Sequence, residues 1–324
     1  MKVSYRWLKR HIPNLPEAAT VADTLTQLGI EVVAQESWGQ DYQKVELVRV
    51  THREPHPHAD HLSLVTIERG SNPSAVVITG AANGFPGEKV WYAPPGTVLP
   101  DGRVLETVMM RGIPSPGMLL SAEELGFQAA TGDLWIWTED HRIGTTFWEV
   151  IGCGDEVFDV EMTPNMAVFD QSMRGLARDL SAALQHPLTA LPHDYGFGSD
   201  LLAQVEAPQR APLYGIVEWE IHPGTVSPLW MQVLLRAIGQ RPIHPAVDAT
   251  NFVLWDIGQP LHAFDGDQIV LPLIVRLARE GEHLTLLDGK ELSLHAEDLI
   301  IADQTGPLAL AGIMGGRRAA VSEQ

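Results

Sequence analysis

The spacing of apolar residues predicts a helical start to the chain. Residues 4–12 mix large apolar and basic side chains at helical spacing, which is typical of a short amphipathic helix. Apolar residues recur at the same spacing over 21–28, and Thr20 with Asp23 resembles a capping box in front of them. We therefore expect two short helices before the pattern changes.

Short β-rich runs replace the helical pattern from about residue 44 onward. Glycine and proline separate the runs, and strands at this spacing with turn signals between them predict a compact β-barrel that ends near residue 153. The runs are KVELVRV (44–50), LSLVTIE (62–68), SAVVIT (74–79), KVWYAP (89–94) and RVLETVMMRG (103–112).

The segment after the barrel mixes a strand and a helix. Alternation of apolar and acidic residues predicts a strand over 155–162, and apolar spacing predicts a helix over 173–184. Residues 186–212 are rich in proline, glycine and small residues, which indicates a loop or linker.

The last block is predicted to be an α+β domain. We expect a strand over 214–221 and a helix over 227–239, with Ser227 as its N-cap. Asp288-Gly289 between two apolar runs predicts a hairpin, and further apolar runs on either side predict a substantial sheet.

Charge argues against a free-standing nucleic-acid binder. The chain has 22 basic and 41 acidic residues, and residues 41–150 have 8 basic and 14 acidic ones, a balance of 8 − 14 = −6. Nucleic-acid affinity comes largely from neutralised phosphates, so an RNA role would need a local patch or a basic partner. The single cysteine, Cys153, excludes an internal disulfide, and no apolar run predicts a membrane helix. A cytoplasmic protein is the expectation.

Polar residues interrupt the apolar stretch VDATNFVLWDIGQPLHAFDGD at residues 247–267. They include Thr250, Asn251, Gln259 and His262. One interpretation is that they are buried polar groups that find partners in the core, after a turn at the proline in this stretch. The other is that they line a binding pocket.

Three groups of motifs resemble the β subunit of phenylalanyl-tRNA synthetase. HPHAD, TGAANGFPGEKVWYAPPGTVLP and MRGIPSPGMLLSAEELG resemble its tRNA-binding domain of oligonucleotide-binding (OB) fold. EMTPN and MRGLARDLSAAL resemble the segment that follows that barrel. RPIHPAVDATNFVLWDIGQPLHAFD and LALAGIMGG resemble its B3/B4 editing domain. The motifs occur in the family's order, and with a similar N-terminal helix the resemblance covers essentially the whole chain.

The resemblance implies an α+β protein in which an OB-fold barrel is inserted in a small mixed N-terminal domain and is followed by a B3/B4 editing-type domain. The implied boundaries are 1–40 plus 154–190 for the small domain, 41–153 for the barrel, 191–212 for a linker and 213–324 for a C-terminally incomplete editing domain. Family β subunits are much longer, so we expect a truncated chain or a shortened paralogue.

Two places depart from the family pattern. After TPN the family usually has Arg-Pro-Asp, where this chain has Met166, Ala167 and Val168. His244 and Pro245 stand where the family usually carries two asparagines. These departures fit a drifted paralogue as well as a truncated chain.

The resemblance also implies an editing pocket for mischarged tyrosyl-tRNA. Polar groups are needed there, because a pocket that accepts tyrosine over phenylalanine must form a hydrogen bond with the tyrosine hydroxyl. An imidazole can also hold the water that hydrolyses the ester. The family adds a glutamate from a later strand, for which Glu323 is no obvious substitute. The implied catalytic residues are Thr250, Asn251 and His262, and the implied substrate-binding residues are Arg241, Gln259, Pro260 and Gly312.

Cationic and aromatic residues of the barrel are candidate RNA contacts, because they can neutralise phosphates or stack on bases. The four histidines between residues 52 and 61 have no cysteine beside them and match no closed zinc set, so no metal site is expected. Glu123 and Glu124 follow Ser121 and are explained by capping. The RNA candidates are Arg49, Arg53, Lys89, Trp91, Arg103 and Arg111.

The predicted function is tRNA binding together with hydrolysis of mischarged tyrosyl-tRNA, impaired in the isolated chain. The sequence has no ATP-binding signature, so ligase activity of this chain alone is not expected; the resemblance places ATP and magnesium on other domains, and no cofactor is expected here. The expected partners are tRNA and a synthetase α-type subunit or another synthetase, without membrane or DNA. Two alternatives stay open: a non-catalytic tRNA-binding module, and a structural or regulatory fragment that docks on a synthetase.

Overall fold

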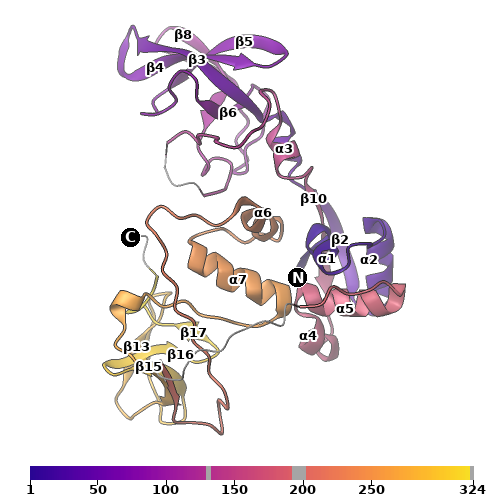
Figure 1. The fold of residues 1–324 in the computed structure, drawn as a ribbon, viewed down its shortest axis with the longest axis vertical. Helices are drawn as coiled ribbons and strands as arrows, with labels where there is room; N and C mark the ends of the chain where they lie inside the picture. The colour runs from indigo at the N-terminus through magenta and orange to yellow at the C-terminus, as the bar shows by residue number, and fades with distance from the viewer. Residues whose placement is uncertain (129–132, 192–201, 322–324) are drawn as a thin grey trace. The chain divides into compact units, whose positions relative to one another are not determined.

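The computed structural model describes residues 1–128, 133–191 and 202–321 (Figure 1). It is a mixed α+β fold, as predicted, and its packing forms two compact units that we describe separately. The first unit comprises Met1–Thr189, Gly224–Asp248 and Asp256–Gly258, and the second comprises Ala190–Pro223, Ala249–Trp255 and Gln259–Gln324. The domain boundaries drawn from the motifs stay a prediction.

One part of the first unit consists of a small antiparallel sheet and four helices, drawn from both ends of residues 1–189. The sheet has the strand order β1-β10-β2, and the alternation over 155–162 correctly predicted its central strand. Helices α1, α2 and α5 surround this sheet in Figure 1. The elements are β1 (Lys2–Ser4), β2 (Glu31–Trp38), β10 (Asp155–Glu161), α1 (Tyr5–His11), α2 (Ala18–Gln27), α4 (Pro164–Asp170) and α5 (Met173–Leu184).

Capping agrees with the sequence at one helix and differs at the next. Ser4 caps α1, because its hydroxyl accepts a hydrogen bond from the Trp7 amide at 2.9 Å. The capping box predicted at Thr20 and Asp23 is wrong, because α2 begins at Ala18 and Glu17 is its N-cap, without a side-chain hydrogen bond. Thr20 lies in the first turn of the helix, so it cannot be the N-cap residue.

The β-rich middle forms a five-stranded antiparallel sheet with the order β5-β4-β3-β6-β9. Its valines and isoleucines pack together in a core that includes Val48, Val65, Ile67 and Val77, which suits the β-branched preference for strands. The elements are β3 (Glu46–His56), β4 (Ala59–Arg69), β5 (Asn72–Thr79), β6 (Lys89–Ala93), β9 (Met118–Leu120), the hairpin β7 (Thr107–Met110) and β8 (Ile113–Pro116), the 3-10 helix η1 (Gln40–Lys44) and α3 (Phe147–Val150).

The five-stranded sheet does not close into a barrel within the described residues. The β7–β8 hairpin forms a sheet of its own, and only isolated bridges join the later segments, such as Val90 to Ile136 and Ser121 to Leu134. The strands are therefore confirmed, whereas their closure into an OB-type barrel is not.

Helix α6 (Leu229–Ala237) packs against the β-rich part of the same unit. The Gln128 amide donates to Oε1 of Gln232 at 2.8 Å, and Val233 joins the aromatic core beside η1 and α3. Arg236 lies 5.7 Å from the centre of the Phe127 ring, and a Cβ at Gly126 would come within 2.3 Å of its guanidinium carbon. Gly126 also has a φ of +78°, which favours glycine at this position.

The second unit has a five-stranded sheet with the order β11-β12-β15-β16-β17, in which β11 runs parallel to β12. The hairpin predicted at Asp288-Gly289 is confirmed by the pairing of β13 with β14. No helix described here is long and apolar enough to cross a membrane. The elements are β11 (Ala203–Val205), β12 (Leu273–Leu277), β13 (His283–Thr285), β14 (Glu291–Ser293), β15 (Leu299–Asp303), β16 (Gly306–Leu310), β17 (Met314–Gly315) and the 3-10 helix η2 (Gly266–Gln268).

The segments around residues 186–239 differ in part from what their sequence predicts. The strand predicted over 214–221 is wrong, because these residues pair with no strand, although Tyr214 and Ile216 pack on the sheet core. The Ser227 cap is also wrong: Pro228 is the N-cap of α6, and the Ser227 hydroxyl donates to Asp248 at 2.5 Å instead. The linker expected over 186–212 lies partly outside the described residues, and its described part contains β11.

Asp155 is a buried carboxyl whose charge opposes folding. Burial raises its pKa to about 6, although hydrogen bonds from the Ser4 hydroxyl and from the Arg6 amide, at 2.9 Å, lower it. An unfolded aspartate titrates near pH 4, so the contribution of Asp155 to stability is fully present below about pH 4 and is lost as the pH rises through about 6.

We predict that Asp155→Asn flattens this loss, because asparagine resembles the protonated acid and carries no charge. The free energy of unfolding of the variant relative to wild type should rise by about 2 kcal/mol, as an order of magnitude, between pH 4 and pH 7. Urea unfolding at several pH values measures it. Parallel pH profiles of the two proteins would contradict the assignment.

Candidate functional site

Helix α7 (Pro245–Ile257) carries two of the predicted pocket residues, and polar groups fix where it begins. The ring Nδ1 of His244 accepts from the Ala246 amide at 3.2 Å. Asp248 is fully buried, and its carboxylate accepts from the Ser227 hydroxyl at 2.5 Å and from the Ile243 amide at 2.8 Å. His244 thus provides the start of α7 with a cap.

The C-terminal end of α7 is fixed by a second carboxylate. Asp256 accepts from the Trp7 indole at 2.7 Å and contacts Nε2 of His11 at 2.7 Å. Burial raises the pKa of Asp256, but the hydrogen bonds from His11 and Trp7 outweigh it, and the pKa lies below its usual range. Between the anchors, Thr250 and Asn251 are half-buried and belong to the second unit.

His262 is the most distinctive of the predicted catalytic residues. The residue keeps solvent exposure, yet its ring packs edge-on against Phe264 with 4.6 Å between ring centres. Gly315, on β17, lies against the same ring, because a Cβ there would come within 2.1 Å of Cε1. This packing lowers the pKa of His262, so the imidazole is neutral near pH 7 and can accept a proton.

The predicted substrate-binding residues are distributed over both units. Gln259 and Pro260 are exposed, and the Gln259 amide donates to the Pro260 carbonyl at 3.1 Å. Gly312 has a φ of +72° and open space where a side chain would begin. These three belong to the same unit as His262, whereas Arg241 belongs to the first unit, where it contacts Glu123 at 3.9 Å.

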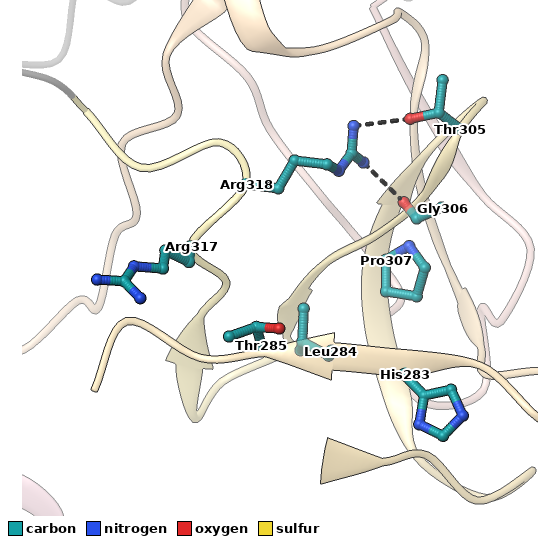
Figure 2. Close-up of a pocket in the computed structure, with 8 residues that line it drawn as sticks. All are labelled: His283, Leu284, Thr285, Thr305, Gly306, Pro307, Arg317 and Arg318. Carbon is teal, nitrogen blue, oxygen red and sulfur yellow. Dashed lines mark hydrogen bonds between the residues drawn. The ribbon is translucent and has the colours of Figure 1, made fainter. Parts of the chain in front are cut away.

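A shallow pocket of about 480 Å³ lies elsewhere on the second unit (Figure 2). In Figure 2 Arg318 points toward Thr305 and Gly306, and it donates to the hydroxyl of the first at 2.7 Å and the carbonyl of the second at 3.2 Å. Arg318 also forms two hydrogen bonds with buried Asp303, so the fold itself occupies its guanidinium. None of the predicted pocket residues is among its lining residues, which are His283, Leu284, Thr285, Thr305, Gly306, Pro307, Arg317 and Arg318.

Trp91 does not suit its predicted role in RNA contact. Its side chain is fully buried in the aromatic core, with Trp137 at 5.1 Å and Phe147 at 4.9 Å between ring centres. A nucleic-acid base has no access to it there. Trp91 is therefore left out of the proposed function.

The basic RNA candidates are mostly engaged within the protein. Arg49 pairs with Glu68 at 3.4 Å and Arg103 pairs with Asp101 at 2.5 Å, and all four residues are exposed. Lys89 donates to the carbonyls of Glu139 and His141 at 3.1 and 3.2 Å. Arg53 donates to loop carbonyls, and Arg111, with a φ of 48°, is exposed at the tip of the β7–β8 hairpin.

The histidines between 52 and 61 show no metal geometry. His56 contacts the Met110 carbonyl at 3.2 Å and its ring meets that of His58 edge-on. In the part of the chain that the structure describes, no group of three or more histidines, cysteines or acids could hold a metal ion. Glu124 makes the reciprocal hydrogen bonds of a cap, since its carboxylate accepts from the Ser121 amide at 2.8 Å and its own amide donates to the Ser121 hydroxyl, but they close a turn and no helix begins there.

Sequence reasoning missed two residues that the structure makes prominent. Gly315 was one of a glycine pair, and only the folded chain shows that it leaves room for the His262 ring. Phe85 lies among the turn residues GAANGFPGE. The sequence of this turn did not predict that Phe85 would be 55% exposed on a well-anchored loop. An apolar residue within a run of turn residues is the one signal that could have singled it out.

The chain matches two family models, a putative tRNA binding domain over residues 45–146 and a B3/4 domain over residues 214–324. It is 35% identical over 325 residues to the phenylalanine–tRNA ligase β subunit of Methylococcus capsulatus, and 37% identical over 329 residues to that of Pectobacterium atrosepticum. These matches cover 99% and 100% of this chain. The chain is thus similar over its whole length to part of the phenylalanine–tRNA ligase β subunit, and it contains a putative tRNA binding domain and a B3/4 domain. It spans 41% of the length of these two relatives.

Solved structures add only distant similarity. An N-terminal fragment of the phenylalanyl-tRNA synthetase β subunit from Pyrococcus horikoshii is 14% identical, with 52% of this chain and 53% of that chain covered and a TM-score of 0.28. A MetRS-related protein from the same organism is 18% identical, with 32% and 88% covered and a TM-score of 0.24. The similarity to β subunits therefore depends on the sequence matches.

We predict that Gly315→Ala displaces the His262 ring, because the new methyl group and the ring cannot occupy the same space. Exposure of the displaced ring should raise the pKa of His262 toward its ordinary value. An NMR titration of the imidazole signals, assigned with a His262 variant, measures this shift. Gly266→Ala is the matched control, since open space surrounds that position. An unchanged titration in Gly315→Ala would refute the contact.

Proposed function

We propose that this β-subunit-like chain edits aminoacyl-tRNA, by hydrolysing the ester of tyrosine mischarged onto tRNA. The observation that carries the proposal is the neutral His262 ring, held against Gly315 in the B3/4 domain, in the same compact unit as Thr250 and Asn251. A neutral imidazole can accept a hydrogen bond from a water and take its proton as that water attacks the ester carbonyl. Thr250 and Asn251 supply hydroxyl and amide groups for the substrate.

We expect this hydrolysis to be slow. Over the described residues His262 makes no hydrogen bond or ion pair to another side chain, so no carboxylate orients its ring or stabilises the imidazolium formed when it takes a proton. Bases in efficient hydrolases are oriented by such a third group. Discrimination should be modest for a related reason, since hydrogen bonds to charged groups contribute about 1.5–3 kcal/mol each and the site has no assigned anion for the tyrosine hydroxyl.

The β-rich region is proposed to bind tRNA and to close into an OB-type barrel. The family model over 45–146 supports the binding, and the order of the five strands with the bridges to later segments supports the closure. A synthetase α-type subunit is proposed as the protein partner and the cytoplasm as the location, because the relatives are β subunits of a tRNA ligase. DNA and membranes are not part of the proposal.

We predict that His262→Ala lowers the rate of tyrosyl-tRNA hydrolysis by roughly a hundredfold, the lower end of what a general base contributes. The assay follows the release of labelled tyrosine from tRNA charged with tyrosine, with phenylalanyl-tRNA beside it. His295→Ala is the control, because the hydrogen bonds of this exposed histidine of the same unit to Asp298 use its backbone amide and carbonyl, which the substitution keeps. Circular dichroism checks that both variants fold.

Two results would overturn the catalytic proposal. Hydrolysis by wild type that survives in His262→Ala would remove His262 from the reaction. Equal inertness of wild type and variant toward both charged tRNAs would leave a non-catalytic tRNA-binding module or, if tRNA is not retained either, a piece that docks on a synthetase.

We predict weak tRNA binding that depends steeply on salt. Arg49 and Arg103 must exchange carboxylates for phosphates, and Arg111 is the best-placed remaining cation, so about three phosphate contacts would give a log–log salt slope of about −2 to −3. Arg111→Ala should reduce the slope by about one contact, whereas Lys2→Ala, on the small N-terminal sheet, should not. Filter binding at several salt concentrations measures the slope, and tight salt-insensitive binding would contradict the prediction.

A further inference from the structure

The loop between β5 and β6 is held in place by the side chain of Arg53. No carboxylate pairs with this guanidinium among the residues that the structure covers, so its charge is met by neutral acceptors alone. One arginine thus ties three successive parts of the loop to strand β3. The acceptors are the carbonyls of Ala81 at 2.6 Å, Gly84 at 3.4 Å and Asn83, together with the Ser63 hydroxyl at 3.2 Å.

Two further side chains fix the same loop. The carboxylate of Glu88 accepts from the amides of Gly84 at 3.1 Å and Phe85 at 2.6 Å. The Asn83 side chain donates to the Leu134 carbonyl at 2.9 Å and accepts from the Leu134 amide at 3.0 Å. Gly84 has a φ of +88°, so the turn before Phe85 also depends on glycine. The backbone that carries Phe85 is therefore defined from several directions.

Phe85 is presented to solvent by this anchored loop. It is 55% exposed, and the guanidinium of Arg53 lies 5.5 Å from the centre of its ring. Single exposed apolar residues are common and need no function by themselves. Phe85 differs from them in that its backbone is fixed and a cation supports its ring, so a planar ligand would meet an aromatic surface that loses little freedom on binding.

Charge decides which ligand suits this surface. Residues 41–150 carry a net charge of 8 − 14 = −6, and the loop itself contains the acidic Glu88, so phosphate neutralisation gives little affinity here. Stacking of a base on an aromatic ring needs no net positive charge, because every base has a π-face. Stacking can therefore add RNA affinity here beyond the few phosphate contacts that the exposed arginines of this acidic region offer.

We propose that Phe85 is a base-stacking platform for an unpaired nucleotide of RNA, with Arg53 as the positioning residue beneath it. The proposal deepens the proposed tRNA binding by the β-rich region and rests on it. It assigns the RNA contact to Phe85 and explains why Arg53 lies at this place without contacting RNA itself. The unpaired base stacks on the ring, and the anchored loop keeps the ring in position.

The test uses the full chain and a single-stranded RNA oligonucleotide that contains 2-aminopurine. Phe85→Ala should weaken binding about 5- to 150-fold, the range expected for one stacked base, and should abolish the quenching of 2-aminopurine fluorescence. The salt slope should stay the same, because no phosphate contact is lost. Phe85→Trp should restore both binding and quenching. Phe169→Ala is the matched control, since Phe169 is 64% exposed on α4, outside the β-rich region.

The possible outcomes separate this inference from the function on which it rests. If wild type binds the RNA and Phe85→Ala binds it equally well, the platform is refuted and tRNA binding stands. If wild type binds neither this RNA nor tRNA at low salt, both proposals fail. If Phe85→Ala loses a protein partner but no RNA affinity, the exposed ring is a protein contact and the stacking proposal is wrong.

Discussion

A carboxylate near each end of α7, fully buried at Asp248 and partly buried at Asp256, fixes the helix on which the candidate site depends. Asp248 accepts from Ser227 and from a backbone amide, and Asp256 accepts from Trp7 and contacts His11. Removing a partner from such a group leaves a desolvated acceptor unpaired, which typically costs about 1–3 kcal/mol and more for a charged group. The helix that carries Thr250 and Asn251 is therefore held by the hydrogen bonds of Asp248 and Asp256.

The catalytic side of the account depends on packing in the same way. The His262 ring packs against Phe264 and Gly315, and its burial lowers its pKa, which favours the neutral imidazole further. The neutral imidazole can accept a proton, but no neighbouring carboxylate among the described residues stabilises the imidazolium that then forms. RNA binding by the β-rich region would likewise use a packed side chain, since an acidic region with few unpaired cations can still bind bases through an exposed ring.

Much of the fold could be predicted because local pattern and tertiary structure agree. Valines and isoleucines in short runs predicted the strands of the β-rich region, and Asp288-Gly289 predicted the β13–β14 hairpin of the second unit. The strand expected over 214–221 failed because alternation alone supplies no partner strand. Helix α7 was not predicted, since four consecutive apolar residues at 252–255 obscure the helical period.

The candidate site could be predicted only in part, because its decisive features are contacts between distant residues. Ser227 looked like a cap, but a carboxylate from the next helix takes its hydroxyl. Trp91 and Phe85 are both aromatic residues in a β-rich region, yet one is fully buried and the other is 55% exposed. Sequence pattern does not distinguish such cases, because burial depends on what packs against the residue.

The central claim is that His262 belongs to a pocket for a tyrosyl ester, and binding tests it without depending on turnover. Adenosine that carries tyrosine on its 3′ position through a stable amide, and the phenylalanine analogue, would be titrated into the chain while the His262 imidazole signals are followed by NMR. The account predicts saturable shifts of these signals, at lower concentration for the tyrosine analogue. Imidazole signals that stay unmoved by both analogues would contradict it.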